Sequence, residues 1–320
     1  MLTTITRRIR GLAVIGAALA CLNPAWAADY PERPVTAMVP FPAGGSTDLM
    51  ARAIAQELTD ALDTNVVVDN RAGGAGTVGM AALARARADG YTIGVVPAAP
   101  LVNQPHMRRT PYDLDAFDYV CQFFESPQAL AVEPDSPFAD LGELVRYAKS
   151  HPGELTYGSP GPGSLPNLAM EQFLEEAGVE ITHVPFGGDG PGVTALMGGH
   201  VDLYMTMSNV VADRELKAVA IFSDEPLDTL PGVRTARAQG HDLTASWWGG
   251  VVAPKGIPDA ARDALERGCR SAADSERLAK VLDRLGTQAV YLGPADFRAK
   301  VESISETNGR LIEKVLKNRS

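Results

Sequence analysis

Two segments of this chain share one pattern, in which an apolar run, a glycine-rich turn and a helix-like run follow one another. In the first, about residues 35–62, the run 35–41 leads through PAGGSTD (42–48) into apolar residues at helical spacing. In the second, about residues 155–177, a short run leads through GSPGPGS (158–164) into another helical pattern. Both turns place unpaired backbone N–H groups at the start of a helix, where an anion can bind without a charged side chain.

Each turn also has a simpler interpretation. Ser46 and Ser164 are typical N-cap residues, and the glycines then only reverse the chain. The presence of two such turns, in what look like separate sheets, favours a two-sided site in a protein that closes about a hinge. Asp48 is expected to point outward and to complement the helix dipole, because a carboxylate in the first turn repels a bound anion.

Apolar runs and helical patterns alternate along the chain and predict an α/β fold. Strands expected at about 35–41, 65–69 and 91–96, with helices between them, form a βαβαβ unit and imply a mostly parallel sheet. Further strands are expected at about 119–124, 128–132, 155–158, 181–184, 201–205, 216–222 and 246–253. Further helices are expected at about 141–150 (capped by Asp140), 165–177 and 190–198, and from Pro258 onward with breaks near Ala273 and at Gly293-Pro294.

Gly74, Gly76 and Gly79 spell the G-x-G-x-x-G fingerprint of dinucleotide-binding proteins. That fingerprint requires a strand running straight into the first glycine and an acidic residue about 20 positions later. Here residues 70–73 intervene, and Asp89 comes too early. An exported NAD-dependent dehydrogenase is therefore the less favoured alternative, and no cofactor is predicted.

The first 27 residues have the three parts of a secretory signal peptide. Three arginines (Arg7, Arg8 and Arg10) precede an apolar run at 11–22, and Ala25-Trp26-Ala27 offers a cleavage site. The apolar run is too short to cross a bilayer, which takes about 20 residues. We therefore expect export and cleavage after Ala27. A lipoprotein signal at Cys21 or a twin-arginine signal fits less well.

The composition excludes several classes of function. Asp and Glu number 39 against 29 Lys and Arg, and the imbalance grows once the three arginines of the signal are removed. Such an acidic chain does not predict binding to nucleic acid or to anionic membranes. The five histidines show no metal-ligand spacing. Ser159 does not lie in a nucleophile motif, so no catalytic residue is predicted.

The cysteines that remain after the signal are Cys121 and Cys269. An oxidising compartment permits a disulfide between them. They are far apart in sequence, however, and both lie in apolar surroundings. We therefore expect two buried free thiols, since free cysteine is among the most buried residue types.

Five stretches together resemble the Bug-type solute-binding receptors of tripartite tricarboxylate transporters. They are YPERPVTAMVPFPAGGSTDLMARAIAQEL, VVVDNRAGGAGTVGMAALARARADGYTI, LTYGSPGPGS, ITHVPFGG and SWWGGVVAPKGIP, in this order over essentially the whole mature chain. The resemblance implies a periplasmic, two-lobed receptor of the type II, Venus-flytrap class, with a mostly parallel sheet in each lobe. Two crossovers are expected at about Ser126 and Trp247. Lobe 1 would then hold residues 28–125 and 248–320, and lobe 2 residues 126–247.

Members of this family typically capture small carboxylates with backbone N–H groups, hydroxyls and ordered waters, and deliver them to two membrane subunits. The resemblance therefore implies a monomeric receptor that is not an enzyme and needs neither metal nor cofactor. The ligand-binding residues that it implies are Phe41, Pro42, Ala43, Gly44, Gly45, Ser46, Thr47, Ala98, Ser159, Gly161, Gly163, Ser164, Phe186 and Asp189.

Several positions depart from the family pattern. Ala43 stands where Pro is usual, residues 97–100 lack the hydroxyl or amide side chains common there, and Asn167 and Gly187 replace residues that are often His and Lys. Fewer polar side chains favour a monocarboxylate with an apolar or aromatic body over citrate. The expected client is a transporter, and a sensor kinase is the alternative, because both need the same receptor. For Trp247-Trp248, stacking on the ligand and packing at the hinge both stay open.

Overall fold

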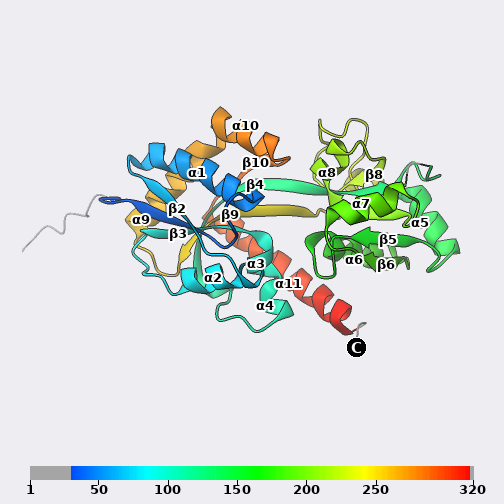
Figure 1. Cartoon of the computed structure of the whole chain (residues 1–320), viewed down its shortest axis with the longest axis horizontal. Helices are drawn as coiled ribbons and strands as arrows, with labels where there is room; N and C mark the ends of the chain where they lie inside the picture. The colour runs from blue at the N-terminus through cyan, green and yellow to red at the C-terminus, as the bar shows by residue number, and fades with distance from the viewer. Residues whose placement is uncertain (1–29, 134, 318–320) are drawn as a thin grey trace, which may run out of the picture.

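The computed structural model describes residues 30–133 and 135–317. The expected signal peptide, residues 1–27, lies outside the described residues. Figure 1 shows two α/β lobes joined by two long strands, β4 (Phe117–Val132) and β9 (Ser246–Pro254). The expected two-lobed α/β architecture is therefore present.

The first lobe is built on β1 (Val35–Val39), β2 (Val66–Asn70) and β3 (Thr92–Pro97), which lie parallel in the order β2-β1-β3. The sheet continues through β9 and β4 to β10 (Gln288–Leu292), each antiparallel to its neighbour. One face is covered by α1 (Ser46–Leu62), α9 (Asp259–Ala273) and α10 (Glu276–Arg284). The other face is covered by α2 (Thr77–Ala84), α3 (Ala98–Val102) and α11 (Pro294–Lys317), with the short α4 (Gln104–Met107) beside α11.

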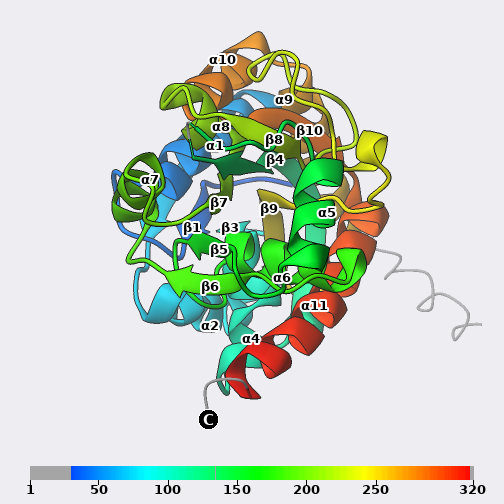
Figure 2. The same cartoon turned by 90° about the vertical axis from the view of Figure 1, so that its right-hand side faces the viewer.

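The second lobe repeats this plan. The strands β6 (Thr182–Pro185), β5 (Thr156–Ser159) and β7 (Leu203–Met207) lie parallel in that order. Antiparallel to β7 comes the end of β4, which also pairs with β8 (Ala218–Ile221). The helices α5 (Leu141–Ser150) and α6 (Leu165–Ala177) cover one face, and α7 (Asp189–Met197) and α8 (Ser208–Asp213) the other. Figure 2 shows α7 on the left of the sheet and α5 on the right.

The two connecting strands run side by side, and Ser126 of β4 pairs with Trp247 of β9. The sequence predicted two separate strands here, because Ser126-Pro127 interrupts the apolar run. The structure instead has one strand of 16 residues. Pro127 lies where β4 leaves its ladder with β9 and begins its ladder with β7, so its missing N–H interrupts neither. Each lobe's sheet is therefore mixed: β2-β1-β3 and β6-β5-β7 are parallel, whereas β9, β4, β10 and β8 pair antiparallel with their neighbours.

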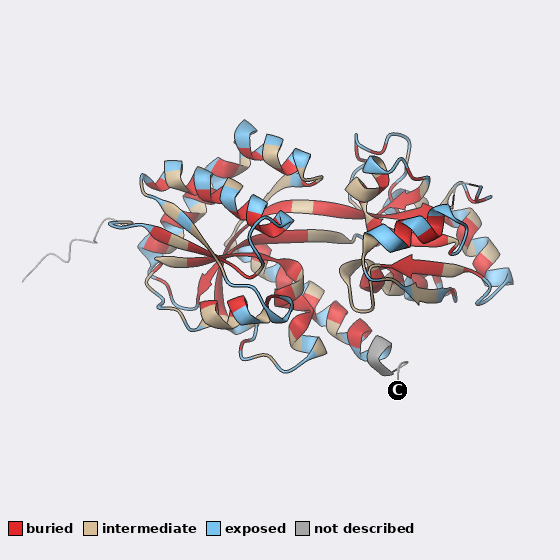
Figure 3. Ribbon diagram, in the orientation of Figure 1, coloured by how far each residue is buried: buried red, intermediate tan, exposed pale blue. Residues whose placement is uncertain are grey.

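Apolar residues at helical spacing bury one side of α1, as the sequence predicted. Met50, Ile54 and Leu58 are each 0% exposed and pack against the sheet and α9. Figure 3 shows this distribution throughout the molecule, with buried strands and helices that are buried on their inner sides. Each lobe therefore has its own core.

The expectation of free thiols is wrong, because Cys121 and Cys269 form a disulfide in the first lobe. Cys121 lies on β4 and Cys269 on α9, and both belong to the core between the sheet and the helices α1 and α9. Their Cα atoms are 6.3 Å apart, a separation that suits a disulfide. A sequence separation of 148 residues conceals this proximity.

The strand β10 was not expected, since the sequence after Pro258 was interpreted as helical. Gly286, at φ +66°, ends the preceding helical segment. Residues 288–292 then pair antiparallel with the edge of β4 that β9 leaves free. Five residues are too few to display a strand period clearly against helical neighbours.

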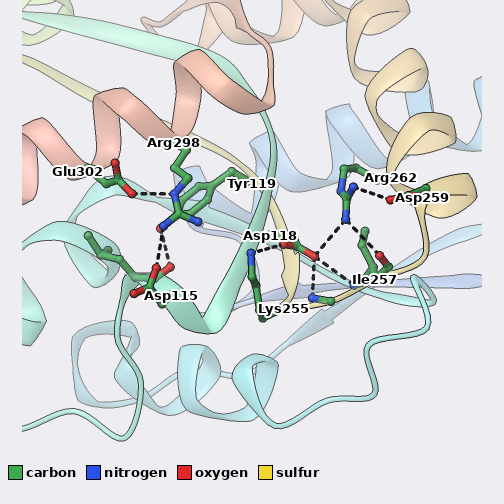
Figure 4. Close-up of polar contacts among 11 residues, drawn as sticks. Asp115, Asp118, Tyr119, Lys255, Ile257, Asp259, Arg262, Arg298 and Glu302 are labelled. Carbon is green, nitrogen blue, oxygen red and sulfur yellow. Dashed lines mark hydrogen bonds and ion pairs between the residues drawn. The ribbon is translucent and has the colours of Figure 1, made fainter.

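A buried carboxylate fixes the start of β4 to the loop that follows β9. Asp118, 8% exposed, accepts hydrogen bonds from Lys255 Nζ at 2.9 Å, Gly256 N at 2.7 Å and Ile257 N at 3.1 Å (Figure 4). Burial acts to raise the pKa of Asp118, but these donors outweigh it and hold the pKa below its ordinary value. The network ties the two connecting strands together at the first lobe.

Candidate ligand-binding site

The sheet topology brings the ends of the parallel strands of the two lobes face to face. β4 runs from the first lobe into the second, and β3, which like β4 is antiparallel to β9, runs the same way. β7 is antiparallel to β4 and so runs toward the first lobe, together with β5 and β6. The loops after β1 and β3 therefore face those after β5, β6 and β7. Open α/β sheets bind ligands at such carboxyl ends.

The first glycine turn, residues 41–47, connects β1 to α1. Residues 42–46 are exposed, and Gly44 adopts φ +83°, which favours glycine. Gly45 is the N-cap of α1, so the interpretation of Ser46 as the cap is wrong. Ser46 is instead the first helical residue. Its N–H and those of Thr47 and Asp48 have no intrahelical acceptor and point out of the start of the helix.

Asp48 does not point outward as expected; it is 2% exposed. Its Oδ2 accepts from Gly44 N at 2.9 Å and Arg52 Nε at 3.0 Å, and its Oδ1 from Asn70 Nδ2 at 3.0 Å. Burial acts to raise the pKa of Asp48, but the hydrogen bonds from Arg52, Gly44 and Asn70 hold it below its ordinary value. Asn70 Nδ2 also donates to Phe41 O at 3.0 Å. Asp48 thus organises the turn from inside.

The second glycine turn, residues 159–164, connects β5 to α6. Ser164 is the N-cap of α6, as the sequence predicted, and its Oγ accepts from Asn167 N at 3.3 Å. Asn167 is 0% exposed, and its Oδ1 accepts from Gly163 N at 2.8 Å. Gly161 and Gly163 have φ of +143° and +74°, so both need glycine. The turn is held by the first residues of its own helix.

Ser159 uses its hydroxyl inside the lobe rather than at the surface. Ser159 is 0% exposed, and its Oγ lies 2.8 Å from His183 Nε2. Its carbonyl accepts from Phe186 N at 3.0 Å, which holds the loop after β6 beside the second glycine turn. Phe186 is half-buried and packs against the ring of Tyr204. Among the predicted residues it offers an aromatic surface at the strand ends.

The side chains of Asp189 and Ala98 both contact residues of their own lobes. Asp189, the first residue of α7, accepts at Oδ1 from Thr206 Oγ1 at 2.7 Å and from Tyr204 OH at 3.2 Å. Burial and the adjacent Asp189 carboxylate raise the pKa of Tyr204. Ala98 is 0% exposed, so only its backbone is available to a ligand. Thr206, which sequence reasoning did not place, is the closest partner of Asp189.

The lobes touch beside the second glycine turn. Asn103, in the first lobe, donates from Nδ2 to Gly163 O at 3.3 Å, and Asn308 Nδ2 of α11 donates to Asn103 Oδ1 at 2.8 Å. No sequence pattern marked Asn103 or Asn308. Within residues 30–133 and 135–317, no hydrogen bond joins residues 41–47 to residues 159–164.

The G-x-G-x-x-G segment serves packing. Gly76, at φ +92°, leaves no room for a Cβ, which would lie 2.6 Å from Pro100 Cγ. A Cβ on Gly79 would lie 2.7 Å from Pro40 Cα. These glycines let α2 and its turn approach the strand ends beside the first glycine turn.

The two tryptophans differ in their surroundings. Trp248 is 0% exposed and packs against Phe297, with ring centroids 5.8 Å apart. Trp247 is half-buried and packs against Phe124 at 5.0 Å. Both rings therefore pack at the connecting strands.

The part of the chain that the structure describes has neither a metal-binding cluster nor a membrane-spanning helix. No group of three or more His, Cys, Asp or Glu residues there has an arrangement that could hold a metal ion. Nor does that part contain a helix with the length and hydropathy needed to span a membrane.

Two lobes, paired connecting strands and facing strand ends define a solute-binding protein of the two-lobed class. The model of the tripartite tricarboxylate transporter family receptor matches residues 50–316, and the chain belongs to this family. It is 35% identical to protein BugT of Bordetella pertussis, over 90% of this chain and 92% of BugT.

Two solved structures show how the fold relates to ligand binding in similar proteins. A solute-binding protein from Polaromonas, solved without ligand, is 28% identical and has a TM-score of 0.84, covering 89% of this chain and 99% of its own. An R. palustris protein solved with adipate is also 28% identical, covering 90% and 98%, but has a TM-score of 0.69. Although the two proteins have the same sequence identity to this chain, its fold superposes better on the ligand-free structure.

Proposed function

We propose that this protein is a periplasmic receptor that captures a small carboxylate between its two glycine turns and has no chemistry of its own. The observation that carries the proposal is the opposition of two helix N-termini across the lobe boundary, one after Gly45 and one after Ser164. Each N-terminus carries partial positive charge; the first offers the N–H groups of Ser46, Thr47 and Asp48, and the second that of Leu165. An anion between them interacts with both N-termini only when the lobes close. Binding therefore favours the closed state over the open one.

The surroundings of the turns support an apolar ligand body. Phe41 and Phe186 are the half-buried aromatic residues of the two sides, and Pro100 lies beside the first turn. Arg52, a cation in the second turn of α1, forms an ion pair with Asp48 of the same lobe. A monocarboxylate with an aromatic or apolar body therefore suits the site better than citrate, which carries three carboxylates to be neutralised.

The similarity to the ligand-free structure supports an open arrangement of the lobes. It agrees with the absence, in the described residues, of hydrogen bonds between the two glycine turns. We assign residues 28–125 and 248–320 to the first lobe and 126–247 to the second, so that hinge bending falls at Ser126 and Trp247. After cleavage behind Ala27 the monomer acts in the periplasm and delivers its ligand to the two membrane subunits of a transporter. Presentation to a sensor kinase is the alternative, and the genes adjacent to this one distinguish the two.

A thermal-shift panel on residues 28–320 tests the ligand class. We expect phenylacetate to bind at least about tenfold more tightly than citrate, with adipate between them. A ligand at 100 times its Kd raises the free energy of unfolding by about 2.7 kcal/mol. Tighter binding of citrate than of phenylacetate would overturn the monocarboxylate assignment. Binding of NAD in preference to every carboxylate would restore the dehydrogenase alternative.

A further inference from the structure

A cavity lies at the connecting strands and reaches Leu165, the residue that follows the second glycine turn. Its volume is about 740 Å³. Its walls come from α6 and residues 222–227 and 242–246 of the second lobe, and from β10 and α11 of the first. None of the predicted ligand-binding residues lines it. In Figure 2 the strand β10 and the helix α11 lie on the right, opposite α7.

One buried amide faces this cavity without a partner. Gln128 of β4 lines the cavity and is 1% exposed. The alternation of β4 puts its side chain on the face of Leu130 and Val132, which pack in the core under α6. Its Oε1 has no hydrogen-bond partner among the described residues. A buried acceptor without a donor costs stability, so Gln128 calls for an N–H or O–H group in the cavity.

The charges around the cavity are predominantly negative. Glu125 in the lining is neutralised by Lys300, whose Nζ lies 2.8 Å from Glu125 Oε2. At the rim Arg237 pairs with both Asp224 and Asp242, which leaves one excess carboxylate there. Glu225 adds another. This surplus disfavours an anionic occupant and favours a neutral or cationic one.

The remaining walls are apolar. Leu165 and Leu243 line the cavity on the second lobe, and Val290 and Ile304 on the first. Trp248 also belongs to the lining; its ring is buried, and its centroid lies 5.7 Å from Lys300 Nζ. A body the size of an aromatic ring fits between these surfaces, as in most small-molecule sites.

We propose that this cavity binds a small organic amine or amide, whose N–H group donates to Gln128 Oε1 and whose apolar body lies between Leu165 and Leu243, close to Trp248. An ionised carboxylate only accepts hydrogen bonds and therefore cannot donate to Gln128 Oε1. The cavity therefore selects a class of molecule different from the carboxylates proposed for the glycine turns, and the proposal does not depend on that function.

Three probes of matched shape test this: phenethylamine, phenylacetamide and phenylacetate. The background is residues 28–320 with Trp247→Phe, which leaves Trp248 as the single tryptophan. Binding is followed by Trp248 fluorescence and by calorimetry. We expect the amine and the amide to saturate the Trp248 signal at millimolar concentration or below. Gln128→Leu should weaken both by about tenfold while leaving the affinity for phenylacetate unchanged.

A second pair of variants keeps the test independent of Gln128. Thr307→Phe narrows the cavity from α11, whereas Glu306→Phe adds the same ring to an exposed position of α11 outside the lining. We expect the first to abolish amine binding and the second to preserve it. The proposal is wrong if neither the amine nor the amide saturates the Trp248 signal. It is also wrong if Gln128→Leu binds these two probes as tightly as the parent, or if the two phenylalanine variants bind the amine equally well.

Discussion

Asp48 and Asn167 occupy the same place in the two glycine turns. Each is the third residue of its helix, and each accepts a hydrogen bond from the glycine N–H four residues earlier. Gly44 N lies 2.9 Å from Asp48 Oδ2, and Gly163 N lies 2.8 Å from Asn167 Oδ1. Both lobes therefore close the turn with a side chain. In α1 this leaves the N–H groups of Ser46, Thr47 and Asp48 without an intrahelical acceptor, whereas in α6 only the N–H of Leu165 is left, because Pro166 has none and Asn167 N donates to Ser164 Oγ.

The partners explain why one position is a carboxylate and the other an amide. Asp48 faces donors only, from Gly44, Arg52 and Asn70. Asn167 also has an acceptor within reach, since its Nδ2 donates to Tyr157 OH at 2.8 Å. An acceptor-only group suits the first position, and a group with both functions suits the second.

Asp48→Asn should destabilise the protein by about 2 kcal/mol, because the new NH₂ group faces donors and leaves them unpaired. Urea unfolding at neutral pH measures the loss. Asp69→Asn is the matched control, since the side chain of Asp69 is 40% exposed and, within residues 30–133 and 135–317, forms an ion pair with Arg71 alone. We expect that control to change stability by no more than about 0.5 kcal/mol. Equal losses in the two variants would show that Asp48 has no special role.

The free energy of unfolding should fall in acid. The folded-state pKa values of Asp48 and Asp118 lie below the unfolded value of 3.8. The stability that they contribute is therefore complete above about pH 4 and is lost as the pH falls through the folded pKa values. Urea midpoints at about pH 3 and pH 7 measure the difference. Asp118→Asn should lower the midpoint at neutral pH and reduce its drop in acid; an unchanged drop would contradict the role of Asp118.

Ser46→Pro should weaken phenylacetate binding by about tenfold or more with little change in stability. Proline is well tolerated at the first helical position, and Gly45 already has the extended φ −80° and ψ 167° that a following proline requires. The substitution removes one N–H, and a hydrogen bond to a charged group contributes about 1.5–3 kcal/mol.

Ser46→Ala is the control for this variant, because it removes the hydroxyl and keeps the N–H. We expect it to bind phenylacetate within about threefold of the parent, as measured by calorimetry. If alanine proved as damaging as proline, the hydroxyl rather than the backbone would be the ligand group.

Reduction of Cys121–Cys269 should lower the free energy of unfolding. A cross-link over 148 residues restricts the unfolded chain, and the chain-entropy model gives about 5 kcal/mol, with about 2–5 kcal/mol usual for native disulfides. A dithiothreitol series in urea measures the effect. The double variant Cys121→Ala/Cys269→Ala should not respond to reductant. An equal response in both proteins would mean that the reductant acts elsewhere.

Helix caps and helical spacing were predicted correctly from the sequence, because both depend on residues that are close together in the chain. Ser164 caps α6 as expected, Asp140 caps α5 through Glu143 N, and the spacing of Ile54 and Leu58 marks α1. These features need only a few neighbouring residues. The glycine turns were found for the same reason, as were the strands before them.

Long-range relationships were not predicted, because no local pattern records them. The inward turn of Asp48 requires Asn70, which lies 22 residues away, and the disulfide requires that β4 and α9 meet. The strand β10 exists because β4 offers a free edge. Asn103 reaches Gly163 only because the lobes meet there. The placement of Ser159 at a ligand stays a prediction, although its hydroxyl is occupied by His183.

The disulfide also has a topological effect. Cys121 and Cys269 lie on either side of every element from α5 to β8, so the second lobe sits inside a covalently closed ring. A protease that cuts one peptide bond anywhere in that lobe leaves both fragments attached to each other. A nicked receptor would therefore migrate as an intact chain until it met a reductant.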